Sequence, residues 1–169
     1  GFKTIAINTH YFGNQISDHV IDSYGQKIEI LISHENDLLG TGGGIKKAIS
    51  SFSDEDIVVI NYDIYSDLDY SYFLNFSSNT VFVVPANQAG SGDFFVKEKL
   101  VNLEGEKNYT WTGFSIIAKE TLNQNEASSF HYWHDCLKIL ATNKKLNAEI
   151  LDINWYDVGN VETLKKLNN

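Results

Sequence analysis

Three stretches of this sequence carry residue types that could bind or transform a phosphorylated ligand. The first is the glycine-rich stretch Gly40-Thr41-Gly42-Gly43-Gly44, which lies between an expected strand and an expected helix. Glycines let a backbone approach a flat or anionic ligand closely, and the N-terminus of a following helix offers free N–H groups. The same pattern is as typical of a flexible turn before a helix, so both interpretations stay open at this point.

Two aspartates, each at the end of an expected strand, are the other candidates. Asp63 follows the apolar stretch 56–62, and Asp157 follows a short extended stretch before the last expected helix. In open α/β sheets, ligands bind beyond the carboxyl ends of strands, and Mg²⁺ takes one or two carboxylates together with substrate phosphates. The two side chains could therefore converge on one metal ion. The plain alternative is that each aspartate belongs to a turn that ends a strand.

The remaining residues with chemical potential are weaker candidates. Asp67 and Asp69 form an Asp-x-Asp pair, a pattern also found in metal-dependent glycosyltransferases, but we interpret it first as the solvated start of a helix. His131 and His134 lack a third metal ligand with matching spacing, so we interpret them as surface or half-buried residues. Cys136 falls on the apolar side of an expected helix, which favours a core position over a nucleophile.

The elements expected around these residues alternate between strands and helices. Apolar and β-branched patterns predict strands over 2–8, 27–33, 56–62, 79–85 and 146–153, and helical spacing predicts helices over 14–24, 45–49, 67–76, 133–143 and after a cap at Asn160. This alternation predicts an α/β fold with right-handed crossovers. Stretches 93–101 and 109–118 are expected to form an antiparallel extension joined by a turn at 104–106.

Composition narrows the class of protein. The 169 residues suit one compact domain, and a hydrophobic fraction of 43% excludes a disordered tail. Lysine and arginine together number 13 against 22 acidic residues, which gives a formal charge of −9 and argues against a nucleic-acid partner. The single cysteine excludes an internal disulfide, and no apolar run is long enough to span a bilayer. We therefore expect a cytoplasmic protein with no membrane partner.

Taken together and in this order, the segments resemble the sugar-1-phosphate nucleotidyltransferases over nearly the whole chain. The motifs that carry the resemblance are Asn-Thr-His-Tyr at 8–11, Leu-Gly-Thr-Gly-Gly-Gly-Ile-Lys-Lys-Ala at 39–48, Val-Val-Ile-Asn-Tyr-Asp at 58–63, Gly-Asp-Phe at 92–94, Thr-Gly-Phe-Ser at 112–115 and Trp-Tyr-Asp-Val-Gly at 155–159. Each is weak alone, and their collinear order makes the match specific. The variants most resemble a compact branch that includes N-acetylmuramate-1-phosphate uridylyltransferase and mannose-1-phosphate guanylyltransferase.

The resemblance implies a fold, a reaction and a set of site residues. The fold would be a Rossmann-like α/β fold of the nucleotide-diphospho-sugar transferase type, with a mixed, mostly parallel sheet and helices on both faces. The reaction would transfer a nucleoside monophosphate from UTP or GTP to a sugar 1-phosphate, which gives a nucleotide sugar and pyrophosphate. Asp63 and Asp157 would be the catalytic residues that hold Mg²⁺, and the stretch 40–44 would contact the nucleotide. Asp93 would bond to sugar hydroxyls, and Gly113 would leave room for the sugar.

The sequence also departs from the family. The family begins with a strand and a glycine-rich loop that bears an arginine, whereas this chain starts at the second strand of that pattern and has no arginine. We therefore expect residues 1–169 to be one N-terminally incomplete nucleotidyltransferase domain, without the central first strand and inactive by itself. Tyr62 stands where the family has glycine, and Asn160 stands where it has threonine.

Two other functions remain open at this stage. A nucleotide-sugar glycosyltransferase of related architecture would use Asp67 and Asp69 as its metal pair. A non-catalytic protein that binds a nucleotide or a sugar would keep the fold without the reaction. The nucleotide base, the sugar and the oligomeric state are not specified by the sequence.

Overall fold

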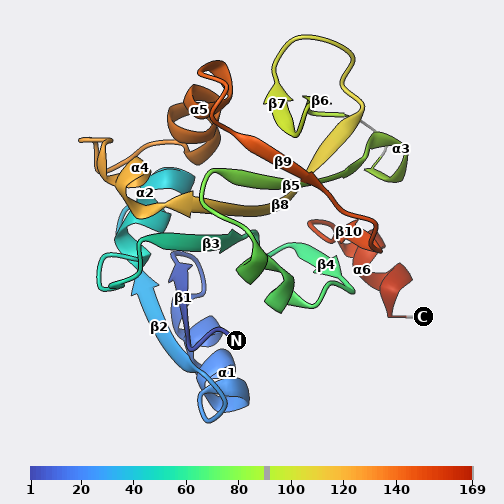
Figure 1. Cartoon of the computed structure of the whole chain (residues 1–169). Coiled ribbons are helices and arrows are strands. Elements are labelled where there is room, and N and C mark those ends of the chain that lie inside the picture. The colour runs from blue at the N-terminus through green and yellow to red at the C-terminus, as the bar shows by residue number, and fades with distance from the viewer. Residues whose placement is uncertain (90–91, 169) are drawn as a thin grey trace. The chain divides into compact units, whose positions relative to one another are not determined.

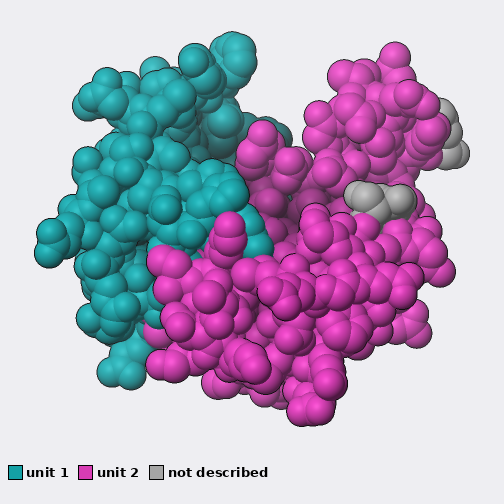
Figure 2. All heavy atoms as spheres, turned by 90° about the horizontal axis from the view of Figure 1, so that it is seen from above, with its two compact units in different colours: residues 1–55, 119–136 teal, residues 56–118, 137–169 magenta. Residues whose placement is uncertain are grey.

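The chain forms two compact units. A computed structural model describes residues 1–89 and 92–168, shown as a ribbon in Figure 1. Unit 1 comprises residues 1–55 and 119–136, and unit 2 comprises residues 56–118 and 137–169, as coloured in Figure 2.

Unit 1 is built on two parallel strands and the helices that pack on them. Strand β1 (Thr4–Thr9) pairs in parallel with β2 (Glu29–His34), and α1 (Gly13–Tyr24) connects them. Helix α2 (Gly40–Ala48) follows β2 and packs against both strands, and α4 (Lys119–Asn123) packs against α2. A short π-helical turn, Trp133–Leu137, begins at the end of this unit. The strand and helix predicted over 2–8 and 14–24 are therefore present.

Unit 2 is built on a six-stranded mixed sheet. Its order is β3-β8-β5-β9-β7-β6, and its strands are β3 (Asp56–Ile60), β5 (Thr80–Pro85), β6 (Phe95–Lys97), β7 (Leu100–Asn102), β8 (Tyr109–Ala118) and β9 (Asn147–Ile150). A separate two-stranded ribbon joins β4 (Ile64–Ser66) to β10 (Trp155–Asp157). The helices are a 3-10 helix (Tyr70–Asn75), α3 (Ala86–Ala89), α5 (Lys138–Thr142) and α6 (Val161–Leu167).

Strand direction in this sheet follows the predicted mixed pattern. Strands β3, β5, β9 and β6 share one direction, and β8 and β7 run opposite to them. Hydrogen-bonded neighbours are nevertheless parallel only in the pairs β1–β2 and β5–β9 within the described residues. The reason is that β8 inserts antiparallel between β3 and β5.

The position of β8 corrects one expectation. Stretch 93–101 pairs antiparallel with 109–118 only at its start, where Phe94 bridges to Tyr109, and the rest of it splits into β6 and β7, which pair with each other. Glu98 and Lys99 form the turn between them, and both have left-handed φ values, 53° and 62°, as a two-residue hairpin turn requires. Residues 112–117 of β8 are all buried. A strand covered on both faces is more stable in the middle of a sheet than at its edge.

One buried cluster of unit 2 lies on one face of β5 and β8. Phe73 of the 3-10 helix packs its ring 4.7 Å from that of Phe82 and 5.5 Å from that of Phe114. Val84, Ile116 and Leu151 complete this buried cluster. Burial of a large apolar side chain contributes about 1.5–3 kcal/mol, so this cluster fixes the sheet on which the candidate site is built.

Strands β1 and β3 are among the described strands that have a neighbour on one side only. In unit 1, β1 pairs with β2 alone, and in unit 2, β3 pairs with β8 alone. In residues 1–89 and 92–168 there is no helix with the length and apolar character needed to cross a bilayer.

Candidate active site

A two-stranded ribbon in unit 2 brings Asp63 and Asp157 together. Strands β4 and β10 pair antiparallel, so that Asp157 lies opposite Ile64. The backbone N–H of Val158 donates to the carbonyl oxygen of Asp63 at 2.8 Å. Two aspartates from distant parts of the sequence thus become neighbours across the ribbon.

The ribbon is attached to the rest of unit 2 by apolar packing and by one hydrogen bond. Ile64 and Trp155 pack against the core cluster of unit 2. The indole N–H of Trp155 donates to the carbonyl oxygen of Thr112 at 3.0 Å, which ties β10 to the buried strand β8. The positions of both aspartates therefore depend on the most buried part of the unit.

The two carboxylates converge at Gly159. A Cβ atom on Gly159 would lie 3.0 Å from Oδ1 of Asp157 and 3.5 Å from Oδ2 of Asp63. Oδ1 of Asp157 already accepts the backbone N–H of Gly159 at 2.8 Å. Across the described ranges, no hydrogen bond or ion pair reaches the carboxylate of Asp63, and the one ion pair recorded joins other residues. Two anionic groups therefore share a small region without a protein cation.

This donor set fits a hard divalent cation. Mg²⁺ prefers oxygen ligands and usually binds through one or two carboxylates, with waters and phosphates completing its shell. A shared cation would also offset the repulsion between two carboxylates held close together. The described residues contain no cluster of three or more His, Cys, Asp or Glu side chains suited to a metal ion. Asp63 and Asp157 would therefore supply only part of the coordination.

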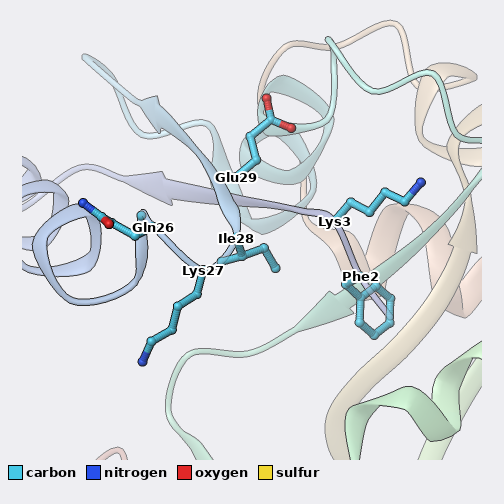
Figure 3. A pocket seen from close by; sticks show the side chains of 7 residues that line it. Phe2, Lys3, Gln26, Lys27, Ile28 and Glu29 are labelled. Carbon is cyan, nitrogen blue, oxygen red and sulfur yellow. The ribbon is translucent and has the colours of Figure 1, made fainter.

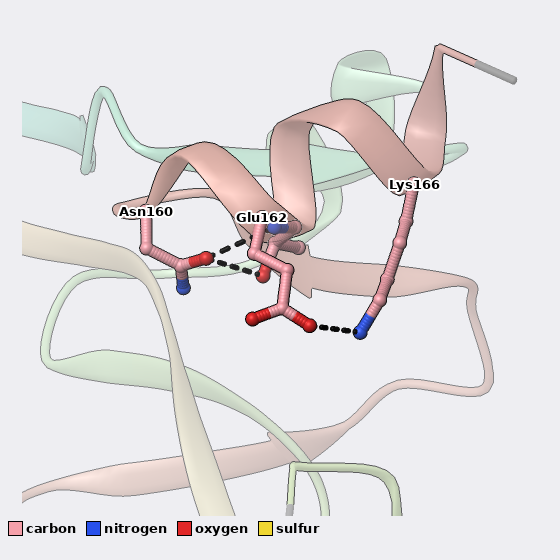
Figure 4. A network of polar contacts seen from close by, with 4 residues as sticks. Asn160, Glu162 and Lys166 are labelled. Carbon is pink, nitrogen blue, oxygen red and sulfur yellow. Dashed lines mark hydrogen bonds and ion pairs between the residues drawn. The ribbon is translucent and has the colours of Figure 1, made fainter.

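The helix that follows these residues is fixed by its cap. Figure 4 shows Asn160 at the start of α6, where its Oδ1 accepts the backbone N–H of Thr163 at 2.9 Å and the Thr163 hydroxyl at 3.1 Å. Glu162 and Lys166 form an exposed ion pair one turn apart, at 2.9 Å. The predicted cap at Asn160 is confirmed, and it holds the chain just beyond Asp157.

The glycine-rich stretch lies in unit 1 and differs from the expectation. Helix α2 begins at Gly40 rather than at residue 45, so the glycines are helical, and Gly42, Gly43 and Gly44 are buried. The N–H groups of Gly42 and Gly43 donate to the carbonyl oxygen of Phe130, at 3.0 and 3.4 Å. The N–H groups expected to be free for an anion are thus engaged within the unit at these two positions.

Close packing explains why this stretch needs glycine. A Cβ atom on Gly42 would lie 2.3 Å from the ring of Phe130, and one on Gly43 would lie 2.2 Å from the carbonyl oxygen of Ser128. Gly40 adopts a left-handed φ of 67°, which glycine reaches at no steric cost. The exposed part of the stretch is Gly40 and Thr41. Contact between this part and a nucleotide stays a prediction.

The two residues predicted to lie beside the sugar, Asp93 and Gly113, are in unit 2. Gly113 has a left-handed φ of 83°, and a Cβ atom there would lie 3.0 Å from the Cβ of Asn61. The space beside Gly113 is therefore occupied by Asn61, which gives this glycine a packing role. Oδ2 of the exposed Asp93 accepts the backbone N–H of Trp111 at 3.0 Å. Contact of either residue with a sugar stays a prediction.

Tyr62 projects into solvent next to Asp63. Its side chain is 98% exposed, so it rests on no other part of the chain. The ring that replaces the family's glycine therefore contributes nothing to packing here.

The aspartates of the alternative glycosyltransferase pair have other partners. Oδ1 of Asp67 accepts the backbone N–H of Asn154 at 3.0 Å, and Oδ2 accepts its side-chain amide at 2.7 Å. Oδ1 of Asp69 caps the 3-10 helix by accepting the N–H of Ser71, and this hydrogen bond lowers the pKa of the carboxyl. Both side chains hold local structure.

The histidines and the cysteine lie where the sequence places them. His131 and His134 are exposed, and the Nδ1 of His131 accepts the backbone N–H of His134 at 3.3 Å. Cys136 is buried, and this burial, with a smaller contribution from Asp135, raises the pKa of its thiol to about 11. A protonated, inaccessible thiol is a poor nucleophile.

The hollows on unit 1 are lined by none of these candidate residues. The larger, about 720 Å³ and open to solvent, is lined by Phe2 and Lys3 before β1 and by residues 25–29 at the start of β2 (Figure 3). It is therefore at the amino ends of the strands, whereas ligands in open α/β sheets bind at the carboxyl ends. A smaller hollow of about 340 Å³ lies between residues 12–15 and His34.

Sequence analysis did not single out two residues that fix the glycine-rich stretch. Phe130 supplies the carbonyl that binds Gly42 and Gly43, and Glu35 accepts the N–H of Leu39 just before α2. No local pattern marks Phe130, because its partner lies far away in the sequence. Glu35 did carry a signal, since it is a charged residue two positions after the strand predicted over 27–33.

The sequence is similar to those of two known nucleotidyltransferases. No family model matches the sequence. It is 26% identical over 178 aligned residues to N-acetylmuramate alpha-1-phosphate uridylyltransferase from Neisseria meningitidis serogroup B, covering 98% of this chain and 77% of that protein. It is 28% identical to D-glycero-alpha-D-manno-heptose 1-phosphate guanylyltransferase from Aneurinibacillus thermoaerophilus, covering 98% of this chain and 73% of that protein.

Solved structures share the fold of this chain. The crystal structure of HddC from Yersinia pseudotuberculosis superposes with a TM-score of 0.82 at 24% identity, over 98% of this chain and 77% of that one. The same protein complexed with GMP-PN gives a TM-score of 0.75 at 24% identity, over 96% and 75% of the two chains. The chain is similar in sequence to sugar-1-phosphate nucleotidyltransferases and shares the fold of HddC. The predicted family resemblance and fold class are thereby confirmed.

Proposed function

We propose that this nucleotidyltransferase relative transfers a nucleoside monophosphate from a nucleoside triphosphate to a sugar 1-phosphate, which gives a nucleotide sugar and pyrophosphate. The observation that carries the proposal is the convergence of Asp63 and Asp157 at Gly159 without a protein cation. The two named relatives, a uridylyltransferase and a guanylyltransferase, support the same class of reaction. The GMP-PN complex of HddC supports a nucleotide as one substrate.

The reaction needs positioning and charge neutralisation more than a strong base. A sugar 1-phosphate is already an anionic nucleophile, so its oxygen can attack the α-phosphorus in line as pyrophosphate departs. Asp63 and Asp157 would hold Mg²⁺, which when bound offsets phosphate charge. The exposed Gly40 and Thr41 would lie against the nucleotide, and Asp93 would bond to sugar hydroxyls. The base would be uracil or guanine.

Turnover of aspartate variants tests this proposal. Asp63→Asn and Asp157→Asn, made in the protein translated from its complete reading frame, should each lower Mg²⁺-dependent pyrophosphate release by about 100-fold or more, because charge stabilisation by a metal is worth several kcal/mol. Asp152→Asn is the matched control, since Asp152 is exposed in the same unit. Normal turnover in either site variant would remove that aspartate from the mechanism.

The domain assignment, the metal and the location belong to the same proposal. We propose that residues 1–169 act as one nucleotidyltransferase domain and that Mg²⁺ is the metal. A cytoplasmic location is supported by the single, unpaired cysteine.

A further inference from the structure

Glu35 is a buried carboxylate that the proposed reaction does not use. Its side chain is 4% exposed, and it is the one Asp, Glu, Lys or Arg among the buried residues of the described chain. Oε1 accepts the side-chain amide of Asn8 at 2.9 Å, and Oε2 accepts the backbone N–H of Leu39 at 3.1 Å. No ion pair to it is recorded within the described ranges.

The contacts of Glu35 join three segments of unit 1. Its own backbone N–H donates to the carbonyl oxygen of Thr9 at 2.7 Å, which fixes it beside the end of β1. Its Oε2 holds Leu39, the residue before α2. A Cβ atom on Gly44 would lie 2.6 Å from its Oε1, so the carboxylate also fills the space under α2.

The buried position of the Glu35 carboxylate lowers the stability of the fold, which is hard to explain if the side chain only holds a turn. Burying a carboxylate without a cation is unfavourable, and neutral side chains cap turns without that cost. The glutamate does, however, provide two acceptors on one rigid group. One acceptor fixes the end of β1, and the other fixes the backbone immediately before the exposed Gly40 and Thr41.

The same short stretch is held from a second direction. The carbonyl oxygen of Phe130 accepts the N–H groups of Gly42 and Gly43, and the hydroxyl of Thr41 accepts the N–H of Tyr132 at 2.9 Å. Gly40 and Thr41 are thus exposed residues held between fixed neighbours. Preorganised backbone of this kind lowers the cost of ordering a loop when a ligand binds.

We propose that Glu35 is a positioning residue for the nucleoside triphosphate, which sets the start of α2 in the conformation that the nucleotide meets. This inference rests on the proposed function. Glu35 acts through Leu39 and does not itself touch the substrate. The sugar 1-phosphate is not expected to contact this turn. Changes at Glu35 should therefore alter the KM for the nucleoside triphosphate only.

Kinetics of three glutamate variants separate positioning from a merely structural role. Glu35→Ala loses both acceptors and should raise the KM for the nucleoside triphosphate about tenfold or more, while the KM for the sugar 1-phosphate stays within about twofold. Glu35→Asp is too short to reach both partners and should show the same split. Glu35→Gln should restore a KM near that of the wild type, because its oxygen can accept from Leu39 while the Asn8 amide turns over to accept from its nitrogen.

Hydrogen exchange supplies a readout that does not depend on turnover. Peptides that cover 36–44 should exchange faster in Glu35→Ala and Glu35→Asp than in the wild type, and peptides that cover 56–60 should not change. Glu55→Ala is the control, because Glu55 is exposed in the same unit. If Glu35→Ala does not fold, Glu35→Asp carries both measurements.

Each outcome decides the inference. The inference is wrong if Glu35→Asp keeps a wild-type KM for the nucleotide, or if the KM rises equally for both substrates. It is also wrong if hydrogen exchange over 36–44 does not change. If the wild type shows no turnover, calorimetry with GTP and UTP replaces kinetics. Nucleotide binding that is weaker in Glu35→Asp than in the wild type would support the role of Glu35 and contradict only the proposed reaction. Absence of nucleotide binding by the wild type overturns both.

Discussion

At the scale of single residues, the proposed chemistry depends on Asp63 and Asp157. Their carboxylates approach one point beside Gly159, and one backbone N–H, that of Gly159, bonds to Asp157. Like charges held this close favour a bound cation. The substrates proposed here are themselves anionic, so a cation between the aspartates and the phosphates resolves both repulsions.

Residue types and their places after strands predicted these two aspartates. The same reasoning left Gly42 and Gly43 open between a ligand-binding loop and a flexible turn, and neither interpretation placed them inside a helix. Their N–H groups are bound by Phe130, a partner about ninety positions away that no local pattern reveals. A glycine can be required by a ligand or by a packed neighbour, and the sequence does not distinguish these causes.

Cys136 gives a prediction of pH dependence. Its pKa in the folded protein is about 11, against 9.0 for an ordinary thiol, so folding favours the protonated form. The stability that it contributes is fully present below pH 9 and is lost as the pH rises towards 11. We expect the free energy of unfolding to fall over this range by at most about 1.4 kcal/mol per pH unit. Denaturant titrations at several pH values measure this.

The variant Cys136→Ala isolates the contribution of the thiol. It removes the titrating group, so its stability should fall less steeply between pH 9 and 11 than that of the wild type. Parallel pH profiles would contradict the assignment of the raised pKa to Cys136.

At the scale of elements, the β4–β10 ribbon and the start of α2 position the candidate residues. The ribbon has three residues in each strand, and it is held by Ile64 and Trp155 packed on the core. Sequence patterns predicted the strand before Asp63 and the helix after Asp157. They missed β4 and merged β6 with β7, because strands of three residues show too little alternation to be recognised.

Asp67 provides a prediction for this ribbon. Asp67→Ala removes two hydrogen bonds to Asn154 that join the segments flanking β4 and β10, so the free energy of unfolding should fall by about 1 kcal/mol. Turnover per folded molecule should stay near that of the wild type. Thermal denaturation and a steady-state assay measure the two effects, with Asp152→Ala as the control. Loss of turnover in fully folded Asp67→Ala would favour the glycosyltransferase alternative.

At the scale of the whole molecule, sheet order was the feature least accessible from the sequence. The alternation of strands and helices predicted a mixed α/β fold, and the solved structures of HddC share it. The central place of β8 was not predicted, because it depends on pairing with β3 and β5, both distant in the sequence. Strand order follows from such non-local contacts, and local patterns contain little information about them.

Local stability should differ strongly along the chain. Five of the six residues of β5 are buried, as are residues 112–117 of β8, whereas α6 has no buried side chain and α1 buries only Gly13. Backbone amides in β5 and β8 should therefore exchange slowest with deuterated solvent, and those in α6 and α1 fastest. Native-state hydrogen exchange followed by mass spectrometry measures this. Faster exchange in β8 than in α1 would show that the sheet order described for unit 2 is wrong.

The central claim is that Asp63 and Asp157 share one divalent cation, and its most direct test is an anomalous difference map from crystals of the protein grown with Mn²⁺. We predict one peak beside Gly159, with an oxygen of each aspartate within about 2–2.5 Å of the metal. The peak should disappear in Asp63→Asn and Asp157→Asn and persist in Asp152→Asn. A metal that contacts only one of the two aspartates, or that binds elsewhere while both carboxylates stay uncoordinated, would contradict the account.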